Sequence, residues 1–256
     1  MLVAERHEKI VETVNRNGSI RVSELSQIFK VTEETIRRDL EKLEKEGELR
    51  RSHGGAVSIK KDKGVEIPYF EREIQNTEEK NMVADIAIQY VKENDRIILD
   101  ASTTAWYMAK RLPDMPLTVL TNSIKVAMEL GRREKITVIG TGGRLLSKSL
   151  SYVGPLAMEA IESYRVDKAF ISCKGIHKKR GISDTNEWQA QVKKKMIEVA
   201  EKVYVLADYS KFNVQAFSKI AQLKDIHTII TDEETKKNDI QEYREEGIEV
   251  ISGNPI

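Results

Sequence analysis

The chain has 256 residues, of which 40% are hydrophobic and 32% are charged, and its 42 Lys and Arg nearly balance 41 Asp and Glu. This composition is too apolar for a disordered chain, and the length suits one large or two modest domains that each bury a core. The formal net charge of +1 gives no overall attraction to nucleic acid, so a DNA-binding function has to rest on local charge.

We expect neither a secretion signal nor a membrane span. No apolar run approaches the roughly 20 residues that cross a bilayer, and the first residues turn charged at Glu5 and Arg6. The single cysteine, Cys173, cannot form an intramolecular disulfide. The four histidines show no metal-ligand spacing; they are His7, His53, His177 and His227. The sequence therefore predicts a cytoplasmic protein that holds no metal and no cofactor.

Apolar residues at helical spacing predict three short helices between Arg6 and about Gly47. The residues that define the three apolar faces are Ile10 and Val14, then Leu25 and Ile28, then Ile36, Leu40 and Leu43. Ser23 and Thr32 are the expected N-caps of the second and third helices, and Gly47 fits the residue after the third. Three such helices have to pack on one another to bury their apolar faces.

A short hairpin is expected next, at residues 49–57, because an alternating stretch there turns at Gly54-Gly55. Helices and hairpin together form a winged helix-turn-helix pattern over residues 1–57. Residues 58–77 read as an inter-domain linker, since they are rich in charge, contain Pro68 and show no sustained period.

From residue 78 to residue 256 the chain alternates between strand-like and helix-like segments. The expected strands are 96–100, 117–121, 136–139, 168–173, 203–206, 228–231 and 249–251. The expected helices are 79–91, 103–112, 124–130, 189–201 and 239–246. Such alternation predicts an α/β domain with a mainly parallel sheet covered by helices.

The third helix of the N-terminal domain has the features of a DNA recognition helix. Polar and basic side chains can point outward, while Ile36 and Leu40 anchor the helix inward. Either Arg37 or Arg38 can bind guanine while the other binds phosphate. The candidate DNA-contacting residues are Thr32, Glu33, Thr35, Arg37 and Arg38 in the helix and Arg50, Arg51, His53 and Gly54 in the hairpin. The alternative is a solvated helix face on which the arginines pair with Glu33, Glu34 or Glu41.

Polar turns follow three consecutive strands of the C-terminal domain. Parallel sheets bind ligands outside the carboxyl ends of their strands, often with phosphate at a helix N-terminus. The candidate ligand residues in these turns are Asp100, Ser102, Thr103, Thr104, Thr121, Asn122, Ser123, Gly142, Gly143 and Arg144. Each turn alone is also a plausible helix cap. Because Leu145 interrupts a G-x-G-x-x-G pattern, a dinucleotide site is disfavoured.

Four further residues are candidates for the same pocket. Lys174 and Gly175 closely follow one expected strand and Lys211 follows another, so either lysine can place an ammonium group near a phosphate. Glu187 stands at a helix start, where it can bind a hydroxyl group or act as a base. The alternatives are a surface lysine at Lys211 and, at Glu187, a carboxylate that offsets the helix dipole.

Taken together, these segments resemble the DeoR family of bacterial transcription regulators. In the N-terminal domain the family pattern is matched by Arg6, Ile10, Val14, Thr32, residues 35–40 and residues 50–56. In the C-terminal domain it is matched by Glu79, Lys80, Ala84, Ala87 and residues 100–104, 120–123, 142–143, 167–170, 193–197 and 208–212. Two positions depart from the family pattern, Ser102 where glycine is common and Lys174 where an acidic or small polar residue is common.

The resemblance implies a C-terminal fold similar to ribose-5-phosphate isomerase and a sensor of phosphorylated sugars, often a repressor released by its effector. Lys174 argues against retained isomerase chemistry. We therefore expect a regulator, specifically a repressor, of carbohydrate metabolism genes that binds double-stranded operator DNA. One winged helix reads few base pairs, so a homodimer or homotetramer is expected. The alternatives are a sugar-phosphate isomerase that uses Asp100, Glu187 and Lys211, and a scaffold with a protein-interaction module.

Overall fold

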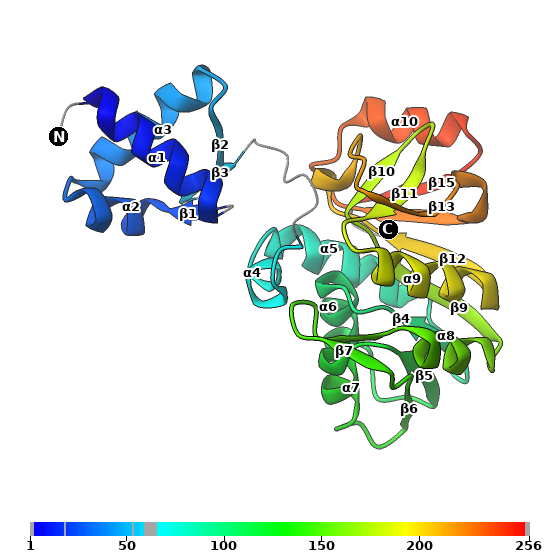
Figure 1. Ribbon diagram of the computed structural model, residues 1–256. Coiled ribbons are helices and arrows are strands. Elements are labelled where there is room, and N and C mark those ends of the chain that lie inside the picture. The colour runs from blue at the N-terminus through cyan, green and yellow to red at the C-terminus, as the bar shows by residue number, and fades with distance from the viewer. Residues whose placement is uncertain (1–2, 18, 53, 59–65, 254–256) are drawn as a thin grey trace. The chain divides into compact units, whose positions relative to one another are not determined.

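The computed structural model describes residues 3–17, 19–52, 54–58 and 66–253. The chain divides into two compact units, Met1–Lys63 and Gly64–Ile256. Figure 1 shows the helical first unit in blue and the larger α/β unit from cyan to red. In the described part of the chain, no helix has the length and apolar character that crossing a membrane requires.

The first unit is a winged helix-turn-helix, as predicted. Its elements are α1 (Val3–Asn17), β1 (Ser19–Arg21), α2 (Val22–Phe29), α3 (Glu33–Lys45), β2 (Leu49–Ser52) and β3 (Gly55–Ser58). β3 pairs with both β2 and β1 in an antiparallel sheet, and β1 was not predicted. Gly54 has φ +82°, and a Cβ on Gly55 would lie 2.3 Å from the Ile20 carbonyl oxygen. The Gly-Gly pair therefore makes the tight turn and lets β1 approach.

Two details of this unit differ from the sequence prediction. Ser23 does not cap α2, because the helix begins one residue earlier and its N-cap, Arg21, forms no side-chain cap bond. Ile28 is 55% exposed, whereas Leu25 is fully buried, so α2 turns Ile28 away from the core. The other predicted apolar positions are buried. Thr32 caps α3 as expected, and Gly47 has φ +74°, which is the left-handed conformation expected after a helix.

A buried ion cluster joins α1 to the back of α3. The two Asp39 carboxylate oxygens accept hydrogen bonds from Arg6 Nε and Nη2 at 2.7 and 3.0 Å, and His7 Nε2 lies 2.9 Å from Oδ1. Burial alone would raise the pKa of Asp39, but the bonds from Arg6 and His7 hold this pKa below its usual value. Asp39 is thus a structural residue next to the outward-facing arginines.

Replacing Asp39 by Asn is expected to cost about 3 kcal/mol, because it leaves the buried Arg6 guanidinium without its counter-charge. Since the folded-state pKa of Asp39 lies below the unfolded value, its ionisation stabilises the protein above pH about 4 and ceases to do so as the pH falls through the folded-state pKa. Calorimetric unfolding of the full chain at several pH values checks both effects. The exposed ion pair of Glu41 and Lys45 supplies the control, since E41Q should leave unfolding unchanged.

The second unit is built on a seven-stranded parallel sheet. Its strands are β4 (Arg96–Leu99), β5 (Leu117–Thr121), β6 (Ile136–Gly140), β9 (Val166–Ser172), β12 (Ala200–Leu206), β14 (Thr228–Thr231) and β15 (Glu249–Ser252). They lie in the order β15-β14-β12-β9-β4-β5-β6, so these seven strands are the seven predicted ones. The chain runs from β4 to β6 in one direction and then returns to β9 on the other side of β4. The carboxyl ends of β4 and β9 thus meet at a topological switch point, where α/β sheets bind ligands.

Helices cover both faces of this sheet (Figure 1). One face packs against α5 (Thr77–Ala87), α6 (Thr103–Arg111) and α7 (Ile124–Leu130). The other packs against α8 (Pro155–Glu162), α9 (Glu187–Val199) and α10 (Lys237–Glu245). Neighbouring residues on one strand face opposite cores: Ile98 belongs to one, and Ile97 and Leu99 to the other. This alternation explains why each central strand is apolar throughout.

Several short elements escaped prediction. They are α4 (Tyr69–Glu73), α8, β7 (Arg144–Leu146), β8 (Ser151–Val153), β10 (Gly175–His177), β11 (Gly181–Asp184), β13 (Ser218–Ala221) and the 3-10 turns η1 (Ile88–Tyr90), η2 (Tyr209–Lys211) and η3 (Leu223–Asp225). β7 pairs with β8, and β11 pairs with β10 and β13, all antiparallel. Apart from α8, these elements have three to five residues, which is too few for a periodicity to be recognised in sequence.

The predicted linker, 58–77, is too long at its C-terminal end. Tyr69 is fully buried, and its backbone N–H donates to the Lys148 carbonyl oxygen at 2.7 Å. The Tyr107 hydroxyl of α6 donates to the Glu73 carbonyl oxygen at 3.1 Å. Helix α4 therefore belongs to the second unit. The charged residues around Tyr69 made this segment read as a linker, although the buried Tyr69 side chain anchors it.

Candidate functional sites

The N-terminal end of α3 is fixed by its cap. Thr32 Oγ1 accepts from the Thr35 N–H at 3.2 Å and lies 2.9 Å from Thr35 Oγ1. Ile36 and Leu40 are buried, which holds the opposite face of the helix against the core. The first turns of α3 therefore present polar side chains to solvent, as the N-terminal end of a recognition helix does.

Arg37 and Arg38 lie on this exposed face. Arg37 Nη2 is 2.8 Å from Glu33 Oε2, and Arg38 Nε is 3.5 Å from Glu34 Oε1. The pairs that the alternative interpretation expected with Glu33 and Glu34 are thus present. Their side chains are exposed, 51% for Arg37 and 78% for Arg38, so the pairs are weak. A duplex can replace them at little cost, and pairing with Glu33 and Glu34 does not conflict with DNA binding.

The hairpin adds positive charge next to this helix within the same unit. Arg50 and Arg51 are exposed on β2, and the Arg51 N–H donates to Glu44 Oε1 of α3 at 2.7 Å. The Gly54 carbonyl oxygen accepts from the Val22 N–H at 2.8 Å, which holds the turn against α2. His53 lies outside the described residues. The arrangement is that of a wing beside a recognition helix.

In the second unit, the predicted residues after β4 and β5 lie at neighbouring strand ends. Asp100 is fully buried; its Oδ1 accepts from the Ser102 N–H at 3.1 Å and its Oδ2 from the Ser172 N–H at 3.0 Å. Thr121 Oγ1 donates to the Leu99 carbonyl oxygen and accepts from the Ser123 N–H. Ser102 and Ser123 cap α6 and α7, and Thr103 and Thr104 are buried in the first turn of α6. Asp100 is thereby fixed between β4 and β9.

A buried lysine of α9 completes this centre. Lys193 Nζ lies 2.6 Å from Asp184 Oδ2, 3.4 Å from Asp100 Oδ2 and 2.8 Å from the Ser172 carbonyl oxygen. Burial would lower the pKa of Lys193, but the two carboxylates hold it above its ordinary value. Burial would likewise raise the pKa of Asp184, and Lys193 holds it below. Lys193, Asp100 and Asp184 thus form a buried group of three charges at the carboxyl ends of β4 and β9.

A second cluster surrounds Asp208, at the end of β12. Asp208 Oδ1 accepts from Asn76 Nδ2 at 3.1 Å, and Lys211 Nζ lies 3.6 Å from Oδ2. Lys80 of α5, only 4% exposed, donates to the carbonyl oxygens of Arg72 and Gln75. Burial lowers the pKa of Lys80 to about 7. Lys211 thus lies by Asp208, which also bonds Asn76 from the chain that follows α4, and its predicted phosphate contact stays a prediction.

Some side-chain atoms around these clusters are buried without a hydrogen-bond partner. Among the described residues these atoms are Tyr69 Oη, Arg72 Nε and Nη2, Asn122 Oδ1, Gln189 Oε1 and Asp208 Oδ2. One short stretch, 148–152, accepts hydrogen bonds from three of these residues. The Lys148 carbonyl oxygen accepts from the Tyr69 backbone N–H, and the Tyr152 carbonyl oxygen accepts from Asn122 Nδ2. The hydroxyl oxygens of Ser149 and Ser151 accept from Gln189 Nε2. Buried polar groups without partners are uncommon, and these atoms are able to form further hydrogen bonds.

Other predicted ligand residues are placed differently. Glu187 is exposed in the first turn of α9, a position that fits the helix-dipole alternative, and its ligand contact stays a prediction. Arg144 is exposed in β7. Gly143 packs against Val153 and Ala157, and a Cβ on Gly175 would lie 2.3 Å from the Val214 carbonyl oxygen, so both glycines serve close packing. Gly142 adopts the left-handed conformation, with φ +62°. The backbone N–H of Lys174 donates to the Ser183 carbonyl oxygen.

Several residues of the two clusters were not predicted as site residues. They are Tyr69, Arg72, Asn76, Lys80, Asp184, Gln189, Lys193 and Asp208. Two of them carry a signal that sequence reasoning can use. Lys193 is three residues from both Ala190 and Met196, and Lys80 is three and four residues before Val83 and Ala84, all buried. A lysine at an apolar position of an amphipathic helix indicates a buried, partnered ammonium group.

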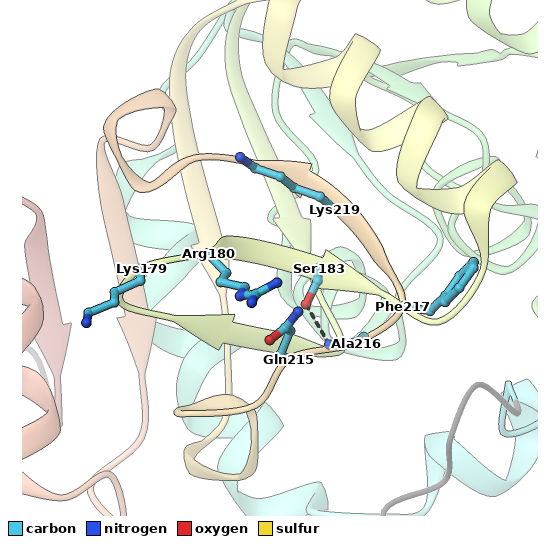
Figure 2. Close-up of a pocket in the computed structure, with 7 residues that line it drawn as sticks. All are labelled: Lys179, Arg180, Ser183, Gln215, Ala216, Phe217 and Lys219. Atoms are coloured by element: carbon cyan, nitrogen blue, oxygen red, sulfur yellow. Dashed lines mark hydrogen bonds between the residues drawn. The ribbon is translucent and has the colours of Figure 1, made fainter.

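A separate hollow of about 380 Å³ contains none of the predicted residues. Figure 2 shows Lys179 and Phe217 at its opposite ends, with Arg180, Ser183 and Gln215 between them. Its buried polar group, Ser183 Oγ, already accepts from the Ala216 N–H at 2.9 Å and donates to the Gly175 carbonyl oxygen at 3.3 Å. The strand-end clusters, with their unpartnered atoms, are the better candidate for a ligand site. No group of three or more potential metal ligands occurs in the described residues.

Comparison with known proteins matches each of the two units to a family domain. The DeoR-like helix-turn-helix domain matches residues 6–62, and the DeoR C terminal sensor domain matches residues 75–233. The uncharacterized HTH-type transcriptional regulator YulB of Bacillus subtilis is 62% identical over 232 residues, which cover 91% of this chain and 90% of that protein. The L-fucose operon activator of Haemophilus influenzae is 40% identical, with 94% and 96% of the two chains covered.

Two further similarities are more distant. The putative aga operon transcriptional repressor of Escherichia coli O157:H7 is 34% identical, with 97% of this chain and 93% of that protein covered. Among solved structures, ribose 5-phosphate isomerase A of Methanocaldococcus jannaschii aligns with TM-score 0.39 and 18% identity over 52% of this chain and 53% of that one. On the domain matches and the full-length relatives, the chain belongs to the DeoR family of transcriptional regulators.

Proposed function

We propose that this regulator is a repressor of carbohydrate genes that binds its operator through α3 and the wing and is released by a phosphorylated sugar. The DNA contacts are assigned to the predicted helix and wing residues, with Arg37 and Arg38 reading or clamping the duplex. The sugar phosphate is assigned to the carboxyl ends of β4, β5, β9 and β12, where Asp100, Asn122 and Lys211 lie.

One observation in the second unit supports a hydroxyl-bearing ligand. Three of the buried unpartnered atoms are acceptors, namely Asn122 Oδ1, Gln189 Oε1 and Asp208 Oδ2. Asn122 Oδ1 and Gln189 Oε1 lack a donor, and Asp208 Oδ2 forms no hydrogen bond and has only Lys211 Nζ at 3.6 Å, so sugar hydroxyls can donate to all three. A buried acceptor without a donor costs about 1–3 kcal/mol, so a ligand that supplies hydroxyls recovers this energy on binding.

Relatives support the carbohydrate assignment. An L-fucose operon activator and a putative aga operon repressor match over nearly their whole length. One of these relatives is an activator and the other a putative repressor, so similarity does not decide the direction of regulation. The repressor assignment is tested by measuring transcription from the operator with and without the protein. A homodimer or homotetramer acting in the cytoplasm fits the proposal, since two recognition helices lengthen the sequence that is read.

We propose a sensor without turnover. Asp100 accepts from two backbone N–H groups and lies by Lys193, while Glu187 is exposed, so two of the acid–base residues that an isomerase would use are not presented to a common substrate position. Incubating concentrated protein with pentose and hexose phosphates should yield no isomerised product. Product formation at a rate that depends on Asp100 would support the enzyme alternative.

The experiment that tests the sensor function combines melting with DNA release. Thermal denaturation is measured with ribose 5-phosphate, glucose 6-phosphate, fructose 1-phosphate and the unphosphorylated sugars. A ligand at 100 times its Kd adds about 2.7 kcal/mol, and only a phosphorylated member should produce this shift. The same compound should weaken binding to an operator duplex, selected from random sequences, by about 5–150-fold. Unchanged operator affinity at saturating ligand would contradict the proposal.

A further inference from the structure

Helix α4 has two opposite sides of different character. Tyr69 is fully buried and the Nε and Nη2 atoms of Arg72 are buried, whereas Phe70 is 63% exposed and Ile74, directly after the helix, is 68% exposed. The inner side places two kinds of hydrogen-bond donor, a phenol and a guanidinium, where no acceptor meets them. Such donors are costly to bury unless an acceptor arrives.

The unpaired edge of Arg72 has a specific shape. Nε and Nη2 form one edge of the guanidinium, which binds two oxygens of a carboxylate or phosphate at once. Arg6 in the same chain uses this edge on the two Asp39 oxygens, at 2.7 and 3.0 Å. Within the described residues, no carboxylate forms an ion pair with Arg72, and its guanidinium carbon lies 5.8 Å from the centre of the Tyr69 ring. The Nε and Nη2 edge of Arg72 is therefore buried in place without an anion bound to it.

Surrounding contacts fix α4 in place around this edge. Lys80 Nζ donates to the Arg72 and Gln75 carbonyl oxygens, and Tyr107 donates to that of Glu73. The other cations of the two clusters already have partners, since Lys193 lies by Asp100 and Asp184, Lys211 lies by Asp208, and Lys80 donates to two carbonyl oxygens. Arg72 is therefore the buried guanidinium whose charge is available to an incoming anion.

We propose that Arg72, assisted by the Tyr69 hydroxyl, binds the phosphate group of the effector, and that α4 reports whether the site is occupied. This inference rests on the proposed sensor function and adds the residue that holds the anionic end of a ligand whose hydroxyls are assigned to the acceptors Asn122, Gln189 and Asp208. In chain order, α4 begins six residues after Lys63, where the DNA-binding unit ends. A ligand that anchors Arg72 thus acts on the first helix after the junction between the units.

The test uses inorganic phosphate and the full-length protein. Phosphate at millimolar concentration should raise the melting temperature of the wild type. R72Q should lose this rise, with affinity at least about tenfold weaker because a charge-assisted bidentate contact is removed. R165Q is the matched control, since Arg165 is an exposed arginine of the same unit and should leave the rise unchanged. A rise of equal size in R72Q, or none in the wild type, would overturn the proposal.

Two further variants guard against a simple folding defect. R72K keeps the positive charge but loses the guanidinium edge that binds two oxygens at once. Its phosphate affinity should therefore lie between those of the wild type and R72Q. Y69F removes a buried hydroxyl without a partner, so it should melt no lower than the wild type without phosphate yet bind phosphate more weakly. If Y69F binds phosphate as the wild type does, the hydroxyl has no part in the site.

Hydrogen exchange tests whether α4 reports occupancy. Phosphate should slow amide exchange in residues 69–76 of the wild type and leave the same residues unchanged in R72Q. Unchanged exchange in the phosphate-bound wild type would refute the reporting role. These assays need neither sugar nor operator, so their failure is distinct from failure of the sensor function, which is judged by the sugar-phosphate panel and by release of DNA.

Discussion

Replacing Arg37 and Arg38 together by alanine is expected to weaken specific operator binding by about 30-fold or more. A bidentate contact to guanine contributes about 1–3 kcal/mol of discrimination, and a phosphate contact adds affinity that falls with salt. The side chains are exposed on α3 and their present partners, Glu33 and Glu34, lie on the same helix surface. The variant should therefore fold normally while it loses affinity. Fluorescence anisotropy with operator and random duplexes at fixed salt measures both affinities.

The matched control removes the same charge from the same helix. Lys42 and Lys45 are exposed in the last turn of α3 and pair with Glu46 and Glu41. Because the N-terminal part of a recognition helix contacts the bases, K42A with K45A should preserve the ratio of operator to random affinity. An equal fall in that ratio for the two double variants would show that net charge, and not base contact, explains the effect. Retained operator affinity in R37A with R38A would favour the protein-interaction module.

The architecture was largely predictable because long, strongly patterned elements carry it. Each central strand is apolar on both faces, and the three helices of the first unit show clear apolar spacing and one recognisable cap at Thr32. Local pattern failed where a tertiary contact decides the structure. Tyr69 anchors α4 inside a stretch that otherwise reads as a polar linker, and β1 exists because Gly55 lets it approach β3.

The candidate ligand site was predicted only in part, for a physical reason. Residues that follow strands directly, such as Asp100 and Thr121, are placed by the general rule for parallel sheets. Lys193 reaches Asp100 and Ser172 from a helix distant in sequence, and no local rule brings it there. Glu187 shows a different limit, since a helix-start carboxylate fits a ligand site and a helix dipole equally well in sequence, and its role stays a prediction.

Replacing Lys193 by methionine is expected to destabilise the second unit by about 3–5 kcal/mol. The change leaves Asp100 and Asp184 buried without the cation that lies 3.4 and 2.6 Å from their oxygens, and breaking a buried pair in this way is costly. At about 2–4 °C for each kcal/mol in a domain of this size, the melting temperature should fall by roughly 6–20 °C. K194M is the control, because Lys194 is the exposed neighbour on the same helix.

The pH dependence of K193M separates lost charge pairing from lost packing. In the wild type, Lys193 holds the pKa of Asp184 below the unfolded value, so stability from this carboxylate is present above pH about 4 and lost as the pH falls through the folded-state pKa. Without Lys193, burial raises the folded-state pKa of Asp184. The native variant then binds more protons than its unfolded chain, so its stability should fall as the pH rises.

The deficit of K193M should therefore be largest near neutral pH and shrink toward pH 4–5, where protonation relieves the uncompensated charge. Adding D184N to K193M removes one of the two stranded carboxylates and should recover part of the lost stability at neutral pH. Chemical denaturation of the wild type, K193M, D184N and the double variant at several pH values measures the coupling between Lys193 and Asp184. A deficit that does not vary with pH, with no recovery in the double variant, would mean that Lys193 stabilises the sheet by packing and that the charged centre has no electrostatic role in folding.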